Sequence, residues 1–228
     1  MAQPGADLLV PEKDEEYHLF TSCPEASLVP RKDSRKAGGC SPVNFDACMG
    51  ATSRASSRDV SILLISGFPA AGKSYFGSWL EENHSYLHLD VEKDGRLGSY
   101  GLLRPWQACF EVGDVADFIR ALDGLRRPVA LNWGFPPRWL SVVKRFKAAG
   151  VTLWWFDADH AAARAAFLAR GDVSIETFNV QMAAINSRLA DIKAAFEPNV
   201  IMTLHPDGTR GEADAIYRRM FDGKGNPA

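Results

Sequence analysis

The 228-residue sequence lacks an excess of charge of either sign, a long apolar run and a regular cysteine pattern. Its 26 Lys and Arg residues nearly balance its 28 Asp and Glu residues, for a formal net charge of -2. This balance provides no broad basic surface for a phosphate backbone, so we expect no nucleic-acid partner. No run of about 18 apolar residues, the length that a membrane-spanning helix needs, is present, so we expect no membrane partner.

Other signals are missing as well. The first residues show no basic segment followed by an apolar signal core, and we therefore expect a cytoplasmic protein. No Asn-Lys-x-Asp string that would specify guanine occurs, which favours ATP without deciding between ATP and GTP. The cysteines share no C-x-x-C spacing, so the sequence predicts neither a zinc site nor a disulfide framework. They are Cys23, Cys40, Cys48 and Cys109.

The composition changes near residue 58. Residues 1–58 mix Pro, Gly, Ser and charge with short apolar stretches, and we interpret them as a flexible or weakly ordered N-terminal extension. From Asp59 to residue 222, apolar runs alternate with amphipathic stretches, and residues 223–228 are a polar tail. The length of this middle part suits one α/β domain with a sizeable core.

The alternation within residues 59–222 predicts the fold class. Strands are predicted at 60–66, 86–90, 128–133, 151–156 and 199–204. Helices are predicted at about 73–82, 114–122, 136–149, 160–170, 175–196 and 213–221, with Asp157 or Asp159 as the cap of the fourth. Parallel strands need crossovers of this length, so we expect a five-stranded parallel sheet with helices on both faces.

The connection between the first strand and the first helix carries the strongest motif. It matches GxxxxGK[ST], the phosphate-binding Walker A pattern or P-loop. Its residues are Gly67, Phe68, Pro69, Ala70, Ala71, Gly72, Lys73 and Ser74. The glycines let the backbone wrap closely around phosphate oxygens at a helix N-terminus. Lys73 is predicted to reach the β- and γ-phosphates, and the Ser74 hydroxyl to ligate Mg²⁺, so the expected ligands are ATP and Mg²⁺.

Two polar residues at predicted strand ends extend the candidate site. Asp90 ends the second strand, where an open α/β sheet faces its ligand, and it is either a general base for a substrate hydroxyl or a turn residue. Asp94 is the weaker carboxylate candidate. Asn132 ends the third strand, where it either binds a Mg²⁺-bound water or serves as a hydrogen-bonding strand end. An amide supplies no negative charge, so metal affinity or turnover is reduced in the first case.

Arginines in the C-terminal half are candidates for closing over the phosphates. Arg170 is the foremost, although a cation at that helix end also suits the helix dipole. Weaker candidates are Arg138, Arg164 and Arg188. We place this lid region at about 160–196.

Taken together, these segments resemble the P-loop kinase-like group of AAA-family ATPases, which is related to small-metabolite kinases, zeta-toxin-like kinases and antibiotic phosphotransferases. The resemblance covers about residues 60–170 and rests on the loop at 67–74, on Asp90, and on segments 131–135, 156–159 and 169–171. It implies a P-loop NTPase fold of the nucleoside- or shikimate-kinase type, with Asp90 as general base and Arg170 as lid arginine. Asn132 departs from the usual Asp, and the lid lacks a second Arg at position 166 or 167.

We therefore expect a kinase that transfers the γ-phosphoryl group of ATP to a small hydroxylated acceptor, with Lys73, Asp90 and Arg170 as its catalytic residues. The alternative is a nucleotide-binding regulatory protein or weak ATPase with degenerate catalytic residues. An ATPase that drives motion in an assembly fits less well, because no helical sensor domain follows the fifth strand. The sequence identifies neither the acceptor nor the oligomeric state.

Overall fold

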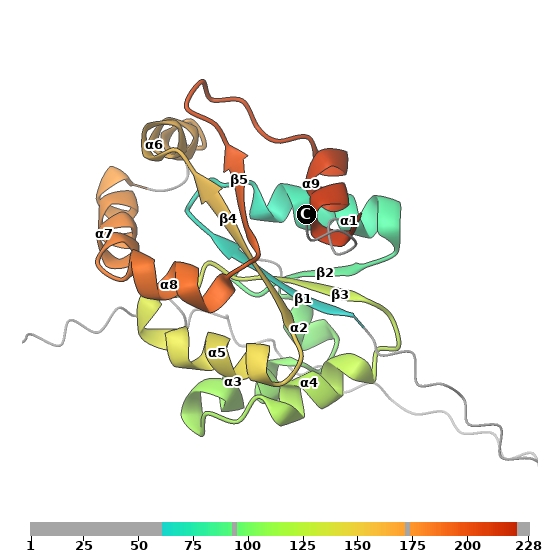
Figure 1. Ribbon diagram of the computed structural model, residues 1–228. Coiled ribbons are helices and arrows are strands. Elements are labelled where there is room, and N and C mark those ends of the chain that lie inside the picture. The colour runs from blue at the N-terminus through green and yellow to red at the C-terminus, as the bar shows by residue number, and fades with distance from the viewer. Residues whose placement is uncertain (1–60, 93–94, 172–173, 223–228) are drawn as a thin grey trace, which may run out of the picture. The chain divides into compact units, whose positions relative to one another are not determined.

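A computed structural model describes residues 61–92, 95–171 and 174–222. Within them, five strands form one sheet in the order β2-β3-β1-β4-β5 (Figure 1). The strands are β1 (Ile62–Gly67), β2 (Leu87–Asp90), β3 (Val129–Asn132), β4 (Thr152–Ala158) and β5 (Val200–Leu204). Every pairing between them is parallel. This confirms the predicted five-stranded parallel sheet.

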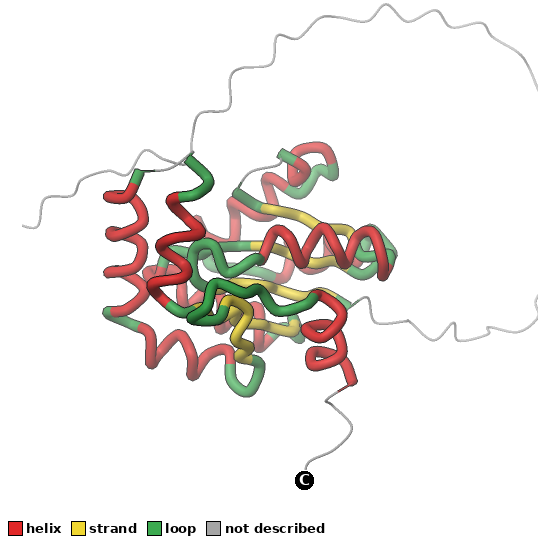
Figure 2. The backbone as a smooth tube through the Cα atoms, turned by 90° about the horizontal axis from the view of Figure 1, so that it is seen from above, coloured by secondary structure: helices red, strands yellow, loops and turns green. Residues whose placement is uncertain are grey.

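Helices connect the strands. They are α1 (Lys73–His84), α2 (Arg96–Ser99), α3 (Leu103–Glu111), α4 (Ala116–Asp123), α5 (Leu140–Ala148), α6 (His160–Leu168), α7 (Ile175–Asn186), α8 (Leu189–Phe196) and α9 (Ala213–Phe221), with a 3-10 turn at Pro137–Trp139. Helices α1 and α9 cover one face of the sheet, and α3, α4 and α5 cover the other (Figure 1). Seen from above, the strands lie among these helices (Figure 2). This confirms the predicted helices on both faces of the sheet.

The strands are apolar on both sides because both faces of the sheet are covered. All six residues of β1 are buried, as expected for a central parallel strand. On the α1 side, Phe76 packs against Phe156 with ring centroids 5.4 Å apart. On the other side, Trp155 packs against Phe196 of α8 at 5.5 Å. The parallel register pairs Asp90 with Asn132 and Gly67 with Phe156, which brings the carboxyl ends of these strands to one level.

The segment that follows β2 is more helical than the sequence predicted. The sequence predicted no helix between the strand at 86–90 and the helix at 114–122, but the chain forms α2 and α3 there. Pro105 lies in the first turn of α3, where a missing N–H is tolerated. Trp106 is buried against Trp133, with ring centroids 5.1 Å apart, so tertiary packing stabilises a helix too short to be stable alone.

The predicted long helix at 175–196 is two helices. The backbone leaves the helical region at Arg188 (φ -130°, ψ 18°), between α7 and α8. The Arg188 side chain donates to the carbonyl oxygen of Pro137 at 3.1 Å, which ties the junction to the turn after β3. The cap of α6 is Asp159, whose carboxylate accepts from the Ala162 N–H at 3.0 Å. Asp157 instead pairs with Lys193 of α8, at 2.7 Å.

Some sequence predictions fall on residues that the structure leaves out. These are the extension at 1–58, the tail at 223–228, Asp94, and the cysteines at 23, 40 and 48. The domain boundaries therefore stay predictions. Within the ranges that the structure does describe, no helix has the length and apolar character to cross a bilayer.

A side chain at Gly67 is expected to destabilise the domain strongly. A Cβ there would overlap the carbonyl oxygen of Phe156, and the φ of 149° is unfavourable for any other residue. We expect Gly67→Ala to lower the free energy of unfolding by about 3 kcal/mol, measured by urea denaturation. Gly98→Ala is the matched control, because its Cβ would meet nothing within 4 Å. Equal effects of the two substitutions would contradict this account.

Candidate functional site

The phosphate loop joins β1 to α1 over residues 68–72. Gly72 adopts a left-handed conformation (φ 87°) immediately before the helix, as does Ala70 (φ 63°) within the loop. The backbone N–H groups of Gly72, Ser74 and Tyr75 have no acceptor among the described residues. They belong to the positive end of a 12-residue helix. This is the arrangement that binds phosphate at a helix N-terminus.

Lys73 folds back over the loop. Its ammonium group donates to the carbonyl oxygens of Gly67 at 3.2 Å and Phe68 at 2.9 Å. These contacts hold the positive charge beside the loop. The role of Lys73 at the β- and γ-phosphates stays a prediction.

Three polar side chains converge beside the first turn of α1. Asp90 and Asn132 are register partners at the ends of β2 and β3. Ser74 donates its hydroxyl to Asp90 Oδ2 at 2.9 Å. The Asn132 amide nitrogen lies 2.7 Å from Ser74 Oγ and 2.9 Å from Asp90 Oδ2. Because a carboxylate only accepts, the amide must turn its nitrogen toward Asp90.

The Asp90 carboxylate is extensively bonded and only 8% exposed. Its second oxygen accepts from the backbone N–H of Glu92 at 3.2 Å. These contacts direct Asp90 toward Ser74, and its role as general base stays a prediction. Asn132 uses its nitrogen as a donor, which favours the interpretation as a hydrogen-bonding strand end over a ligand of metal-bound water.

The residues present fit a Mg²⁺ ion. Ser74 Oγ and Asp90 Oδ2 are oxygen ligands of the kind that Mg²⁺ prefers, and Asp90 supplies the negative charge that Asn132 lacks. No group of three or more His, Cys, Asp or Glu side chains is placed to hold a metal in the part of the chain that the structure describes. A Mg²⁺ bound with a nucleotide needs no such group, because phosphates and water complete its shell.

The predicted lid arginines are not assembled at the loop. Arg170 follows α6 and is exposed, as is Arg164, and neither side chain bonds to any described residue. Arg188 contacts Pro137, and Arg138 lies over the Trp139 ring at 5.7 Å. The role of Arg170 stays a prediction.

The predicted lid region contains a segment that packs on the sheet. Helix α8 buries Ile192, Ala195 and Phe196 and contacts β4 and α5. We therefore restrict the proposed lid to α6 and α7. His160 packs on the Phe68 ring with centroids 4.9 Å apart, which places the start of α6 next to the phosphate loop, and the lid role of α6 and α7 stays a prediction.

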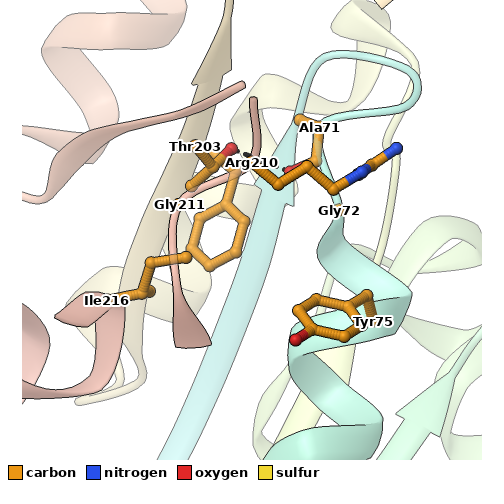
Figure 3. A pocket seen from close by; sticks show the side chains of 8 residues that line it. Ala71, Gly72, Tyr75, Thr203, Arg210, Gly211 and Ile216 are labelled. Atoms are coloured by element: carbon orange, nitrogen blue, oxygen red, sulfur yellow. Dashed lines mark hydrogen bonds between the residues drawn. The ribbon is translucent and has the colours of Figure 1, made fainter. Parts of the chain in front are cut away.

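Three residues beside the phosphate loop were not predicted from the sequence, namely Tyr75, Thr203 and Arg210. Together with loop residues they line a shallow, solvent-open hollow (Figure 3). Thr203 donates to the carbonyl of Ala71 at 2.8 Å, and Arg210 to that of Ala70 at 3.1 Å. The available signal was a polar residue within the apolar strand Val200–Leu204. Its partner could not be identified without the strand order.

Cys109 is the cysteine that the structure describes, and it is buried on α3. Burial raises the pKa of its thiol to about 12. We expect Cys109 to resist iodoacetamide at about pH 8 in the native chain and to react fully in denaturant, as measured by mass spectrometry. Serine at positions 23, 40 and 48 isolates its signal. Stoichiometric labelling of the folded chain would show that the thiol is accessible.

The strand order and the phosphate loop define a P-loop kinase-like fold. Comparison with family models and with curated proteins gives no match. Among solved structures, the chain is similar to a shikimate kinase from Bacteroides thetaiotaomicron, with 11% identity, TM-score 0.45, and 72% of this chain and 98% of that chain covered. It is similar to a gluconokinase from Sinorhizobium meliloti 1021, with 13% identity, TM-score 0.41, and 73% of this chain and 92% of that chain covered. It is also similar to a chain of the PezAT toxin-antitoxin system of Streptococcus pneumoniae, with 13% identity, TM-score 0.35, and 71% of this chain and 77% of that chain covered.

Proposed function

We propose that this protein is a kinase that transfers the γ-phosphoryl group of ATP to a small hydroxylated molecule, in the presence of Mg²⁺. The observation that carries the proposal is the convergence of Ser74, Asp90 and Asn132 beside the phosphate loop. A structural strand-to-helix turn needs no buried carboxylate on its serine. A site for a phosphate-bound cation does.

The chain's own groups account for binding and charge stabilisation. The N–H groups of Gly72 and Ser74 and the Lys73 ammonium donate to phosphate oxygens. These donors are held in place before the reaction, so they need little reorganisation during it. Mg²⁺, when bound, neutralises phosphate charge. Asp90 orients the Ser74 hydroxyl through a 2.9 Å hydrogen bond.

The acceptor side offers a second carboxylate. The Glu92 oxygens lie 3.4 Å from the position that a Cβ on Gly134 would take. Gly134 follows β3 and is exposed, as is Glu92, whose backbone N–H donates to Asp90 at 3.2 Å. We propose that Glu92 faces the acceptor hydroxyl, and it competes with Asp90 for the predicted role of general base.

The hollow beside Tyr75 is the proposed place of the nucleotide base. Tyr75 is 55% exposed, although a large aromatic ring usually gains from burial. It follows Ser74 directly and lines the hollow with Ile216 and Gly211 (Figure 3). A planar base stacking on this ring would bury apolar surface on both partners.

The test is Mg²⁺- and acceptor-dependent release of ADP, measured across sugars, nucleosides, amino alcohols and aminoglycosides. We expect one class to stimulate release at least about tenfold, and Glu92→Gln to remove most of that stimulation. Glu111→Gln is the matched control, because Glu111 pairs with Arg104 on an exposed helix. ATP binding without stimulation by any acceptor would reject the kinase assignment.

The second candidate is a nucleotide-binding regulatory protein or weak ATPase. It is favoured by Asn132, which supplies an amide where a second carboxylate would strengthen the metal site. Under this proposal ATP binds tightly, ADP release stays slow with every acceptor, and Glu92→Gln has no effect on release.

A further inference from the structure

Two side chains distant in sequence hold the outer side of the phosphate loop. Arg210 Nη1 donates to the carbonyl oxygen of Ala70 at 3.1 Å, and Thr203 Oγ1 donates to that of Ala71 at 2.8 Å. We propose that Arg210 and Thr203 are positioning residues that keep the loop in its polyphosphate-binding shape. This role rests on the proposed nucleotide binding, and it means that β5 and the segment after β5 hold the phosphate loop in shape.

The loop conformation explains why such support is needed. Ala70 adopts a left-handed φ of 63°, which residues other than glycine rarely adopt. A cradle for phosphate requires that carbonyls point outward while N–H groups point toward the anion. Each of the two outward carbonyls, at Ala70 and Ala71, is bonded by one of the two side chains. Rotation of either peptide would break that bond and turn a carbonyl dipole toward the phosphates.

Thr203 is suited to this role by its burial. It is 3% exposed, and its hydroxyl lies 2.8 Å from Ala71 O and 3.1 Å from Asp157 O. A hydroxyl has one proton, so the shorter contact to the loop is the stronger one. The same group therefore connects β4, β5 and the phosphate loop in the interior.

Arg210 adds charge to the same position. It forms no ion pair with a described carboxylate. Its Nη1 lies 3.1 Å from the place of a Cβ on Gly72 (Figure 3). The backbone beneath it is fixed, because Leu204 and Arg210 form an antiparallel bridge and the Gly211 N–H donates to Thr203 O at 2.9 Å. The guanidinium thus raises the positive potential of the loop from behind.

The experiment compares two ligands by isothermal titration calorimetry with the full chain and Mg²⁺. ATP has a base, and inorganic tripolyphosphate has only the phosphates. We expect Arg210→Ala and Thr203→Val each to weaken both ligands by a similar factor, about tenfold, because the loop itself is affected. Tyr75→Ala is the matched control and is expected to weaken ATP alone. Thr203→Ser keeps the hydroxyl and is expected to bind both ligands like the wild type.

The outcomes separate this inference from the proposed function. A wild-type chain that binds neither ligand overturns both. If Arg210→Ala binds both ligands like the wild type, the positioning role alone is overturned. If Arg210→Ala weakens ATP but not tripolyphosphate, the positioning role is also overturned, and Arg210 is assigned to the nucleotide base. Arg210 is exposed, so its substitution tests the inference even if the Thr203→Val chain fails to fold in thermal denaturation.

Discussion

Lys73→Ala is expected to weaken ATP binding at least about a hundredfold and to lower acceptor-dependent ADP release about a thousandfold. A thousandfold loss corresponds to about 4 kcal/mol of transition-state stabilisation. The reason lies in the geometry of the loop, where the ammonium lies 2.9 Å from Phe68 O and 3.2 Å from Gly67 O. Without it, the loop loses the cation that lies nearest to its helix N-terminus on the strand side, and Arg210 behind the loop does not replace that contact. Calorimetry gives the affinity, and a coupled ADP assay gives the rate.

The matched control for this prediction is Lys144→Ala. Lys144 is an exposed lysine on α5, so its loss removes the same charge from the chain without touching the loop. Unchanged thermal stability of both variants excludes misfolding. An ATP affinity for Lys73→Ala within about threefold of the wild type would mean that the nucleotide does not occupy the loop.

Asp90→Asn is expected to lower Mg²⁺-dependent turnover by about a hundred- to a thousandfold, with a smaller effect on ATP affinity measured without Mg²⁺. The substitution keeps the shape of the side chain and removes the carboxylate that accepts from Ser74 at 2.9 Å and Asn132 at 2.9 Å. We also expect a stability loss of about 1 kcal/mol, because three donors then face an amide. Titration of Mg²⁺ in the ADP assay separates weaker metal binding from slower chemistry.

Asn132 offers a way to test whether Asp90 acts through its negative charge, because a carboxylate can be moved from position 90 to position 132. Asp90 and Asn132 are register partners, and both contact Ser74. If Asp90 acts mainly through its charge at Ser74, the double variant Asp90→Asn, Asn132→Asp is expected to recover a large part of the lost turnover. If Asp90 is the general base, the double variant stays inactive, since the carboxylate then lies on the wrong strand. Full activity of Asp90→Asn alone would exclude both roles.

Most secondary structure was predictable because it follows from local chemistry. The apolar runs of β1 and β4 and the glycine-rich turn at 67–72 identify a strand, a loop and a helix without reference to the rest of the chain. Helix α3 was missed because it depends on Trp106 burying itself against Trp133, a contact between segments far apart in sequence. The break between α7 and α8 was missed for a similar reason, since Arg188 bonds to Pro137.

The sequence by itself determined the phosphate loop, because the spacing from Gly67 to Ser74 is a property of one continuous turn. It also placed Asp90 and Asn132 at strand ends. Only the tertiary structure decided that both side chains meet at Ser74, because the parallel pairing of β2 with β3 brings their carboxyl ends to one level. It alone revealed Thr203 and Arg210 behind the loop, because their contacts span the sheet order from β1 through β4 to β5. Residues that act through one turn of chain are visible in the sequence, and those that act across strands become visible when the sheet is assembled.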